Sequence, residues 1–473
     1  MYRLLLIALL LGLVIFQIQG EKIPLNDGAG IVGVELRTVS EGFLEHFDDE
    51  GYEAFLVQRI LPFALLNMTF ELFGFDMDPE SFLHGILIFN FLALLLGIYW
   101  YLRIVKKLRS SAKMEVLGFV LMFGSFLVLK ISWYEPFSPA LFAYIVGIGQ
   151  VNYFIRYEKT KLFLVSLLGG FVWPTLFPVG MILIFMPNDK LVFKESERNF
   201  RVKYILPGLV LTAAMALFAV LFPERVFEGA NLFEWLISLI ALFIVITLGV
   251  NHSGIDWGKS LKLAQKKFKA ERLTYLILSI GSYFLVIALL AVGKPSLSIK
   301  DFVFGILAYP VFKPLLFLIS HFSFFGILIP LSIIFFSRIS REAGKMGLGF
   351  SFLFILMMLF SLYGEAIWLA GFAPFMVLLI LKGLRRYTLV AKDIWLIGFL
   401  NLMLSRFWYK INVEGLSESL SSQPNSFPAQ RYFQHFGLTQ SMPAYIIFLL
   451  VLVMMLLIIY YGKKRYAKAP DNI

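Results

Sequence analysis

Three consecutive carboxylates, Asp48, Asp49 and Glu50, stand in a chain that is otherwise dominated by apolar residues. Hydrophobic residues make up 59% of the 473 residues and charged residues only 15%, so a dense group of charges is a candidate for chemistry. A carboxylate placed beside a hydroxyl group can act as a general base and remove its proton. The candidate catalytic residues are therefore Asp49, Asp48 and Glu50, and the alternative is an acidic loop that is merely solvated.

Basic residues that suit a phosphate group occur after this cluster and again near the C-terminus. Arg59 follows a short apolar stretch and precedes Leu61 and Pro62. A second group lies in the aromatic-rich polar stretch 405–443, for which an ordinary connecting loop is the alternative interpretation. Arginine and lysine neutralise the charge on a departing phosphate, and arginine can do so with two parallel hydrogen bonds. The candidate phosphate-binding residues are Arg59, Arg406, Lys410, Arg431 and His435.

Apolar runs long enough to cross a bilayer make up much of the chain and predict the elements that position these residues. Backbone polar groups find no water in the hydrocarbon region, so each spanning segment must be a helix. We expect an all-α polytopic transmembrane bundle of about 11–14 spans, with juxtamembrane helices in the first loop. The chain contains no cysteine, which excludes disulfides, thiolate zinc sites and cysteine nucleophiles.

Basic residues gather in alternate loops and predict on which side of the membrane each loop lies. The net charge of +11 is then explained by cytoplasmic lysines and arginines rather than by binding to nucleic acid. Both termini are expected in the cytoplasm and the loop with Asp49 outside it, and the cysteine-free composition favours the cytoplasmic membrane of a bacterium. We expect one integral membrane domain over residues 1–473: a first span over 1–20, an extracytoplasmic loop with interfacial helices over 21–80, a transmembrane core over 81–404, an extracytoplasmic loop over 405–443, and a last span with a cytoplasmic tail over 444–473.

The apolar stretch 162–186 is too long for one span and is interrupted by the segment Trp173-Pro174-Thr175-Leu176-Phe177-Pro178. Proline removes a backbone donor and kinks or ends helices, and the carbonyl groups that it frees are tolerated in a bilayer only where they are buried or line a cavity. The break is therefore expected to face a cavity that takes up a lipid. Residues 294–314 are also apolar but interrupted, and precede an expected span over 315–336. The candidate groove residues are Trp173, Pro174, Pro178 and Lys313.

Other ionisable residues in the apolar part of the chain are expected to be structural. Lys130 and Glu135 flank one expected turn outside the membrane and are expected to pair with each other. His321 stands beside an apolar run and is expected to be packed rather than to bind a ligand. Charged residues are scarce within the expected spans and no repeat-related halves are found, which both disfavour a transporter.

The order of residues from Asp49 onwards resembles the first extracytoplasmic loop of the GT-C superfamily, the membrane glycosyltransferases that use polyprenyl-phosphate sugar donors. The sequence Asp49-Glu50-Gly51-Tyr52 matches the Asp-Glu-x-Tyr pattern that follows the first span in those enzymes. An interfacial helix with Arg59 and a Leu-Pro pair comes next, ending at Leu72-Phe73-Gly74, and a span that ends in basic residues at Lys107 follows it. The likeness covers roughly residues 1–190 and the overall topology, and the chain departs from the pattern by adding Asp48.

The resemblance implies inverting transfer of a sugar from a polyprenyl-phosphate donor to an acceptor on the extracytoplasmic side. Asp49 would be the base, and Asp48 or Glu50 would either replace it or orient it. The implied partners are the donor, a glycan, lipid or protein acceptor, and membrane lipids, with no nucleic acid. No cofactor is identified; a divalent metal stays open, although the sequence has no second acidic motif to hold one. The alternatives are a polysaccharide polymerase or ligase of a cell-envelope glycan pathway and a polytopic transporter or flippase.

Overall fold

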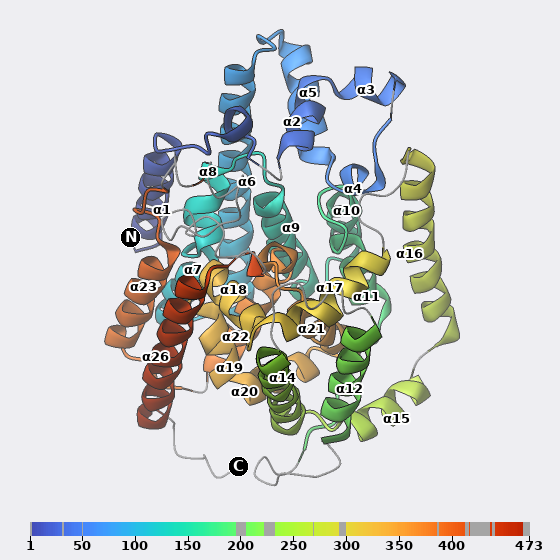
Figure 1. The fold of residues 1–473 in the computed structure, drawn as a ribbon, viewed down its shortest axis with the longest axis vertical. Helices are drawn as coiled ribbons and strands as arrows, with labels where there is room; N and C mark the ends of the chain where they lie inside the picture. The colour runs from blue at the N-terminus through green and yellow to red at the C-terminus, as the bar shows by residue number, and fades with distance from the viewer. Residues whose placement is uncertain are drawn as a thin grey trace.

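A computed structural model describes residues 2–30, 33–49, 51–194, 205–221, 232–267, 269–292, 299–385, 387–411, 416, 436–437 and 440–466. In these residues the secondary structure is helical, and the β pairings found there are isolated bridges between single residues. Figure 1 shows the helices packed side by side, with α2, α3 and α5 at one end of the molecule and α15 near the other. The expected all-α polytopic helical bundle is therefore confirmed.

The chain contains both short and long helices. Up to residue 194 they are α1 (Tyr2–Ile18), η1 (Leu25–Gly28), α2 (Val34–Glu41), α3 (Phe43–Asp49), α4 (Ala54–Val57), α5 (Leu61–Phe73), α6 (Pro79–Leu108), α7 (Ala112–Phe123), η2 (Leu127–Ile131), α8 (Ser132–Tyr134), α9 (Ala140–Ile155), α10 (Lys159–Gly170) and α11 (Leu176–Phe185). After residue 204 they are α12 (Ile205–Leu221), α14 (Leu232–His252), α15 (Trp257–Lys267), α16 (Ala270–Leu290), α17 (Ile299–Phe312), α18 (Leu316–Phe325), α19 (Leu328–Ile334), α20 (Phe336–Lys345), α21 (Leu348–Phe360), η4 (Ala366–Leu369), α22 (Ala373–Leu384), α23 (Ala391–Ser405) and α26 (Met442–Tyr466).

Helices that are long and apolar enough to cross a bilayer occur from the first quarter of the chain to its end. Shorter apolar helices, of 10–17 residues, accompany them. The protein is therefore a multi-pass membrane protein. In the described part of the chain, four helices meet the length and composition of a span on their own: Pro79–Leu108, Phe233–His252, Ala270–Leu290 and Met442–Lys463.

Two further pairs of helices are bent at a short break, and the number rises to six within the described residues if each pair is counted as one span. Ala112–Phe123 and Leu127–Tyr134 meet at 58°, and Gly305–Val311 and Leu316–Phe325 meet at 100°. The expected span 315–336 breaks again at Gly326. Its φ is +62°, a conformation that glycine adopts without strain because it has no Cβ. Breaks of this kind leave fewer full-length spans than the about 11–14 that continuous apolar runs predict.

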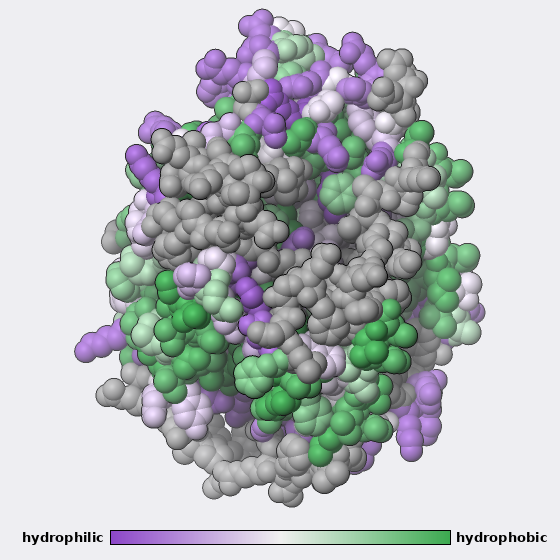
Figure 2. All heavy atoms as spheres, in the orientation of Figure 1, coloured by the Kyte–Doolittle hydropathy of each residue, from purple (hydrophilic) through white to green (hydrophobic). Residues whose placement is uncertain are grey.

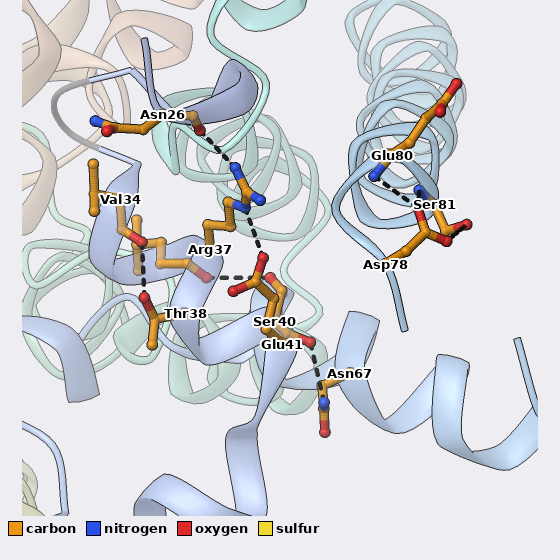
Figure 3. A network of polar contacts seen from close by, with 11 residues as sticks. Asn26, Val34, Arg37, Thr38, Ser40, Glu41, Asn67, Asp78, Glu80 and Ser81 are labelled. Carbon is orange, nitrogen blue, oxygen red and sulfur yellow. Dashed lines mark hydrogen bonds and ion pairs between the residues drawn. The ribbon is translucent and has the colours of Figure 1, made fainter. Parts of the chain in front are cut away.

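Helices α2 to α5, which we call the cap, stand at one end of the bundle (Figure 1). Hydrophilic residues gather at this end, whereas hydrophobic residues cover the flanks below it (Figure 2). Arg37 donates hydrogen bonds to the carbonyl of Asn26 at 2.6 Å and to Glu41 at 2.7 Å (Figure 3). The buried amide of Asn67 donates to the carbonyl of Ser40 at 3.0 Å and so joins α5 to α2. The first loop thus carries the helices that the sequence predicts.

Helix α6 begins beside the cap and runs down into the bundle for 30 residues. Asp78 caps its N-terminus by accepting hydrogen bonds from N–H groups of the first turn at 3.0 and 3.1 Å (Figure 3). Its last turn carries Lys106 and Lys107, and Arg103 pairs there with Glu158 at 3.3 Å. Basic side chains on α6 therefore lie at the end far from the cap.

Close packing between α9 and the turn before α22 brings two distant tryptophans together. A Cβ added to Gly147 would lie 2.4 Å from the carbonyl oxygen of Gly371, so the two backbones approach as only small residues allow. Gly371 lies against Leu176 at the start of α11. The rings of Trp173 and Trp368 consequently meet edge to face, with centroids 5.3 Å apart. The break between α10 and α11 is thereby placed beside η4.

Candidate functional site

A cavity of about 370 Å³ lies between the cap and the bundle. Its walls come from α4, the break between α10 and α11, α16, α21, and η4 with the start of α22. Most of the lining side chains are apolar, and among the described residues that line it Arg59 alone is charged. The lining residues are Ala54, Phe55, Gln58, Arg59, Pro174, Thr175, Pro178, Val179, Ile280, Phe284, Leu356, Phe360, Trp368 and Phe372.

The guanidinium group of Arg59 is enclosed by aromatic rings. The residue is 2% exposed, and its Cζ lies 3.7 Å from the ring centroid of Phe55, 4.5 Å from that of Trp173 and 5.6 Å from that of Trp368. Its Nη1 donates to the carbonyl of Phe55 at 2.8 Å. No carboxylate of the described residues forms an ion pair with it, and burial lowers the pKa of the guanidinium to about 9. The cation is held by π faces and one carbonyl, so its charge is left for an anion.

Two polar groups beside Arg59 also have no hydrogen-bond partner among the described residues. They are Nε1 of Trp173, whose side chain is almost fully buried, and Oγ1 of Thr175, which belongs to a lining residue. Buried polar atoms are nearly always hydrogen-bonded in folded proteins, so an unsatisfied one asks for an explanation such as a ligand or water. A guanidinium, an indole N–H and a hydroxyl are each able to donate a hydrogen bond to the oxygens of a phosphate group.

The chain leads from the acidic cluster directly into this cavity. Helix α3 ends at Asp49, and α4, which begins at Ala54, supplies the first lining residues. Between them, Tyr52 accepts a backbone hydrogen bond from Val292 at 2.9 Å and donates its hydroxyl to the carbonyl of Phe43 at 3.0 Å. The segment after α3 is thus fastened to the end of α16. Glu50 and the side chains of Asp48 and Asp49 lie outside the described residues.

Gly51 is fixed by its surroundings as well as by its backbone. Its φ is +70°, and an added Cβ would lie 2.4 Å from Cγ2 of Val292. The left-handed conformation and the close approach both require glycine here. The glycine of the acidic motif therefore lets the loop press against the end of α16.

The structure brings some of the predicted site residues together and leaves others apart. Arg59, Pro174 and Pro178 line the cavity, and Trp173 lies against Arg59. The chain does break between Gly170 and Leu176, where the prolines predict an interruption.

Of the other predicted cations, those that the structure describes do not line this cavity. Arg406 donates to the carbonyl of Ser323 at 2.6 Å and lies 4.2 Å from the ring centroid of Phe126. Lys313 donates to the carbonyl of Gln440 at 3.2 Å, so this groove candidate serves a different part of the fold. Lys410 is exposed, and Arg431 and His435 lie outside the described residues.

Lys130 pairs differently from the prediction. Its Nζ lies 2.6 Å from Oε1 of Glu21, and Glu21 also accepts from the backbone N–H of Ile411 at 3.0 Å. Glu135 instead lies beyond the end of α8, in non-helical backbone, and against Gly30. The expected pair of Lys130 with Glu135 is therefore wrong, because the end of α1 brings a nearer carboxylate.

Glu365 is a residue near the cavity that sequence reasoning missed. It is half-buried in the turn between α21 and η4, and Nε1 of Trp368 donates to its Oε2 at 3.3 Å. Burial raises the pKa of this carboxyl group. Its backbone bridges to Phe436, and the N–H of Gly437 donates to the carbonyl of Gly364 at 3.0 Å. The sequence did offer a signal for this residue, because a single carboxylate between two apolar helices is a candidate for a functional site.

No group of three or more metal-binding side chains occurs among the residues that the structure describes. No family model, no curated protein and no solved structure matches this chain. A function must therefore be inferred from the cavity, the cap and the distribution of charge.

Proposed function

We propose that this protein is a membrane glycosyltransferase of the GT-C type that moves a sugar from a polyprenyl-phosphate donor to an acceptor. The supporting observation is the buried Arg59, which has no carboxylate partner among the described residues and lines an otherwise apolar cavity. A polyprenyl-phosphate sugar complements such a cavity, because it carries one anionic phosphate on a long apolar chain. Arg59, with Trp173 and Thr175 as neutral donors, holds the phosphate.

The apolar chain of the donor enters past α16. Ile280 and Phe284 of this helix line the cavity, and only 17% of its apolar stretch is buried inside the protein. A helix so widely exposed faces the acyl chains of a bilayer over most of its length. It therefore separates the cavity from the lipid and offers the shortest route between them.

Sugar transfer proceeds by displacement at the anomeric carbon. The hydroxyl oxygen of the acceptor attacks this carbon, the bond from the carbon to the phosphate oxygen breaks, and polyprenyl phosphate leaves with the bonding electrons. A carboxylate of the acidic cluster, Asp49 or its neighbours Asp48 and Glu50, takes the proton of the acceptor, and the configuration is inverted. Arg59 stabilises the charge that develops on the leaving phosphate, and its burial makes this interaction stronger than it would be in water.

The same proposal places the cap outside the cytoplasm. Basic residues at the far end of α6 support this orientation by the positive-inside rule. The acidic cluster and the cavity then lie near the extracytoplasmic face, and both termini in the cytoplasm of a bacterial cell. The acceptor is a glycan, a lipid or a protein of the cell envelope.

Replacement of Arg59 tests this function. The full-length protein in nanodiscs is titrated with a fluorescent polyprenyl-phosphate hexose, and transfer from the same donor is measured with a mixture of envelope acceptors. Arg59→Gln loses hydrogen bonds to a charged phosphate, which are worth about 1.5–3 kcal/mol each, so affinity falls about ten- to a hundredfold. Arg59→Lys keeps the charge and retains part of the affinity.

Lys107→Gln is the matched control, because it removes a charge at the far end of α6. It leaves donor affinity unchanged. An Arg59→Gln protein that stays folded and binds the donor as tightly as the wild type would contradict the proposal. Movement of the labelled lipid between leaflets without any transfer would favour a flippase instead.

A further inference from the structure

A buried guanidinium and a half-buried carboxylate lie beside the same indole ring. The Cζ of Arg59 is 5.6 Å from the ring centroid of Trp368, and Nε1 of the same indole donates to Glu365 at 3.3 Å. Oppositely charged side chains in a protein interior usually pair directly, because each offsets the desolvation of the other. Here Arg59 and Glu365 form no ion pair with each other, and Trp368, which lines the cavity, contacts both.

The described residues around Glu365 contribute little positive charge. Tyr363 and Trp368 flank it in the chain, and the centroids of their rings are 5.4 Å apart. Tyr309 of α17 is close enough for its hydroxyl to interact electrostatically with the carboxylate. Phe436 faces it through the backbone bridge. Burial and the hydrogen bond from Trp368 are the influences on its carboxyl group among the described residues, and none of them is a cation.

The charges around the cavity set a limit on the ligand. Arg59 and ionised Glu365 together carry no net charge. A lipid phosphodiester adds one negative charge and a diphosphate-linked lipid adds two, and each uncompensated charge in a desolvated site is costly. At an effective dielectric constant of about 20, a second negative charge about 10 Å from Glu365 weakens binding on the order of tenfold.

We propose that Glu365 is a specificity-determining residue that limits the ligand of the Arg59 cavity to an amphiphilic phosphodiester and excludes diphosphate-linked lipids. This inference rests on the proposed function for the polyprenyl-phosphate sugar. The chemistry itself is shared with anionic phospholipids such as phosphatidylglycerol, which are also phosphodiesters with one negative charge. The two sources are therefore compared in the experiment.

The pH dependence of this selection follows from the environment of Glu365. Burial raises the pKa of its carboxyl group, so protons bind to it at a higher pH than to an exposed glutamate. Above that pKa the carboxylate is charged and repels the second phosphate. As the pH falls through it, Glu365 becomes neutral and the repulsion is lost. Discrimination against the diphosphate is therefore strong at high pH and weak at low pH.

The experiment measures affinities in phosphatidylcholine nanodiscs for three probes at pH 8 and pH 5. The probes are a polyprenyl-phosphate hexose, the diphosphate hexose with the same prenyl chain, and phosphatidylglycerol. The wild type prefers the phosphodiester at least tenfold at pH 8 and less at pH 5. Glu365→Gln keeps an acceptor for the indole N–H of Trp368, loses most of this preference and no longer responds to pH. Glu365→Asp keeps the charge and the preference.

Glu71→Gln, which removes an exposed carboxylate on α5, is the matched control and changes neither ratio. Equal affinity of the wild type for both polyprenyl lipids, or an unchanged ratio in folded Glu365→Gln, would overturn the inference. If that variant does not fold, the pH dependence of the wild type decides alone. Tighter binding of phosphatidylglycerol than of the polyprenyl phosphodiester would keep the charge limit and contradict the proposed function.

Discussion

At the scale of single residues, Arg59 and Lys130 show two ways to keep a cation inside this protein. Lys130 is buried and forms an ion pair with Glu21 at 2.6 Å, so its charge is offset within the fold. Arg59 is equally buried but is surrounded by aromatic faces, which hold a cation without neutralising it. The difference in partners, rather than in burial, makes Arg59 the candidate for binding an anion.

Replacement of Asp49 tests the base at the same scale. Asp49→Asn should lower turnover by about 10²–10⁴-fold, the usual contribution of a positioned general base. Donor binding should change little, since the phosphate is held by Arg59. Both quantities are measured on the purified protein, with transfer rates at saturating donor and affinities by titration.

The neighbouring carboxylate supplies the control for this prediction. Asp48→Asn should lower turnover only slightly if Asp48 merely orients Asp49. If Asp48 is the base, Asp48→Asn should cause the large loss of turnover and Asp49→Asn the small one. A folded protein in which both variants remain fully active would remove the acidic cluster from the mechanism. Turnover would then be tested next in Glu365→Gln.

At the scale of elements, the sequence predicts where helices and breaks occur better than it predicts how they meet. Apolar runs indicate the helices, and the pair of prolines indicates the interruption between α10 and α11, because both signals are local. The break at Gly326 lies within an apolar run and leaves no trace in hydropathy. The approach of Trp368 to Arg59 depends on the packing of segments far apart in the chain, which periodicity does not encode.

The loop between α3 and α4 gives a prediction at this scale. Gly51→Ala should destabilise the attachment of this loop to the end of α16, because the residue is left-handed and its Cβ would meet Val292. A left-handed conformation alone costs about 1–2 kcal/mol for a residue with a Cβ. Limited proteolysis of the loop should accelerate, and turnover should fall with it.

Gly74→Ala separates the effect of backbone strain from that of a steric clash. Gly74 has a φ of +65° and no heavy atom within 4 Å of an added Cβ, so it shares the backbone strain of Gly51 without the clash. We expect a smaller loss of stability and a normal rate of cleavage in the loop after α3. Equal effects of the two substitutions would mean that the contact with Val292 does not hold the loop.

At the scale of the whole molecule, charge and apolar surface divide the protein into three zones. Hydrophilic residues cover the cap and hydrophobic residues cover the flanks (Figure 2). Lysines stand in the last turn of α6, at the end far from the cap. The proposed orientation puts the cap outside the cell. The chain contains no cysteine, so a cysteine introduced at one position is the only one present. Its labelling therefore reports the orientation directly.

Labelling with a membrane-impermeant maleimide reads out the orientation. Asp76→Cys, in the exposed turn before α6, should react in intact cells. Lys107→Cys and Lys266→Cys should react only after the membrane is opened, because basic segments stay in the cytoplasm. Reaction of Lys107→Cys in intact cells would reverse the whole topology and place the cavity near the other face.

The enclosure of Arg59 between Trp173 and Trp368 also gives the protein an optical reporter of its own. The two indoles lie 5.3 Å apart, and the charge between them acts on the excited state of both. A phosphate that draws the guanidinium towards itself changes that field, so the ultraviolet emission of the unlabelled protein should shift as a ligand arrives. Six other tryptophans emit from elsewhere among the eight in the chain, and they set a constant background against which the change is seen.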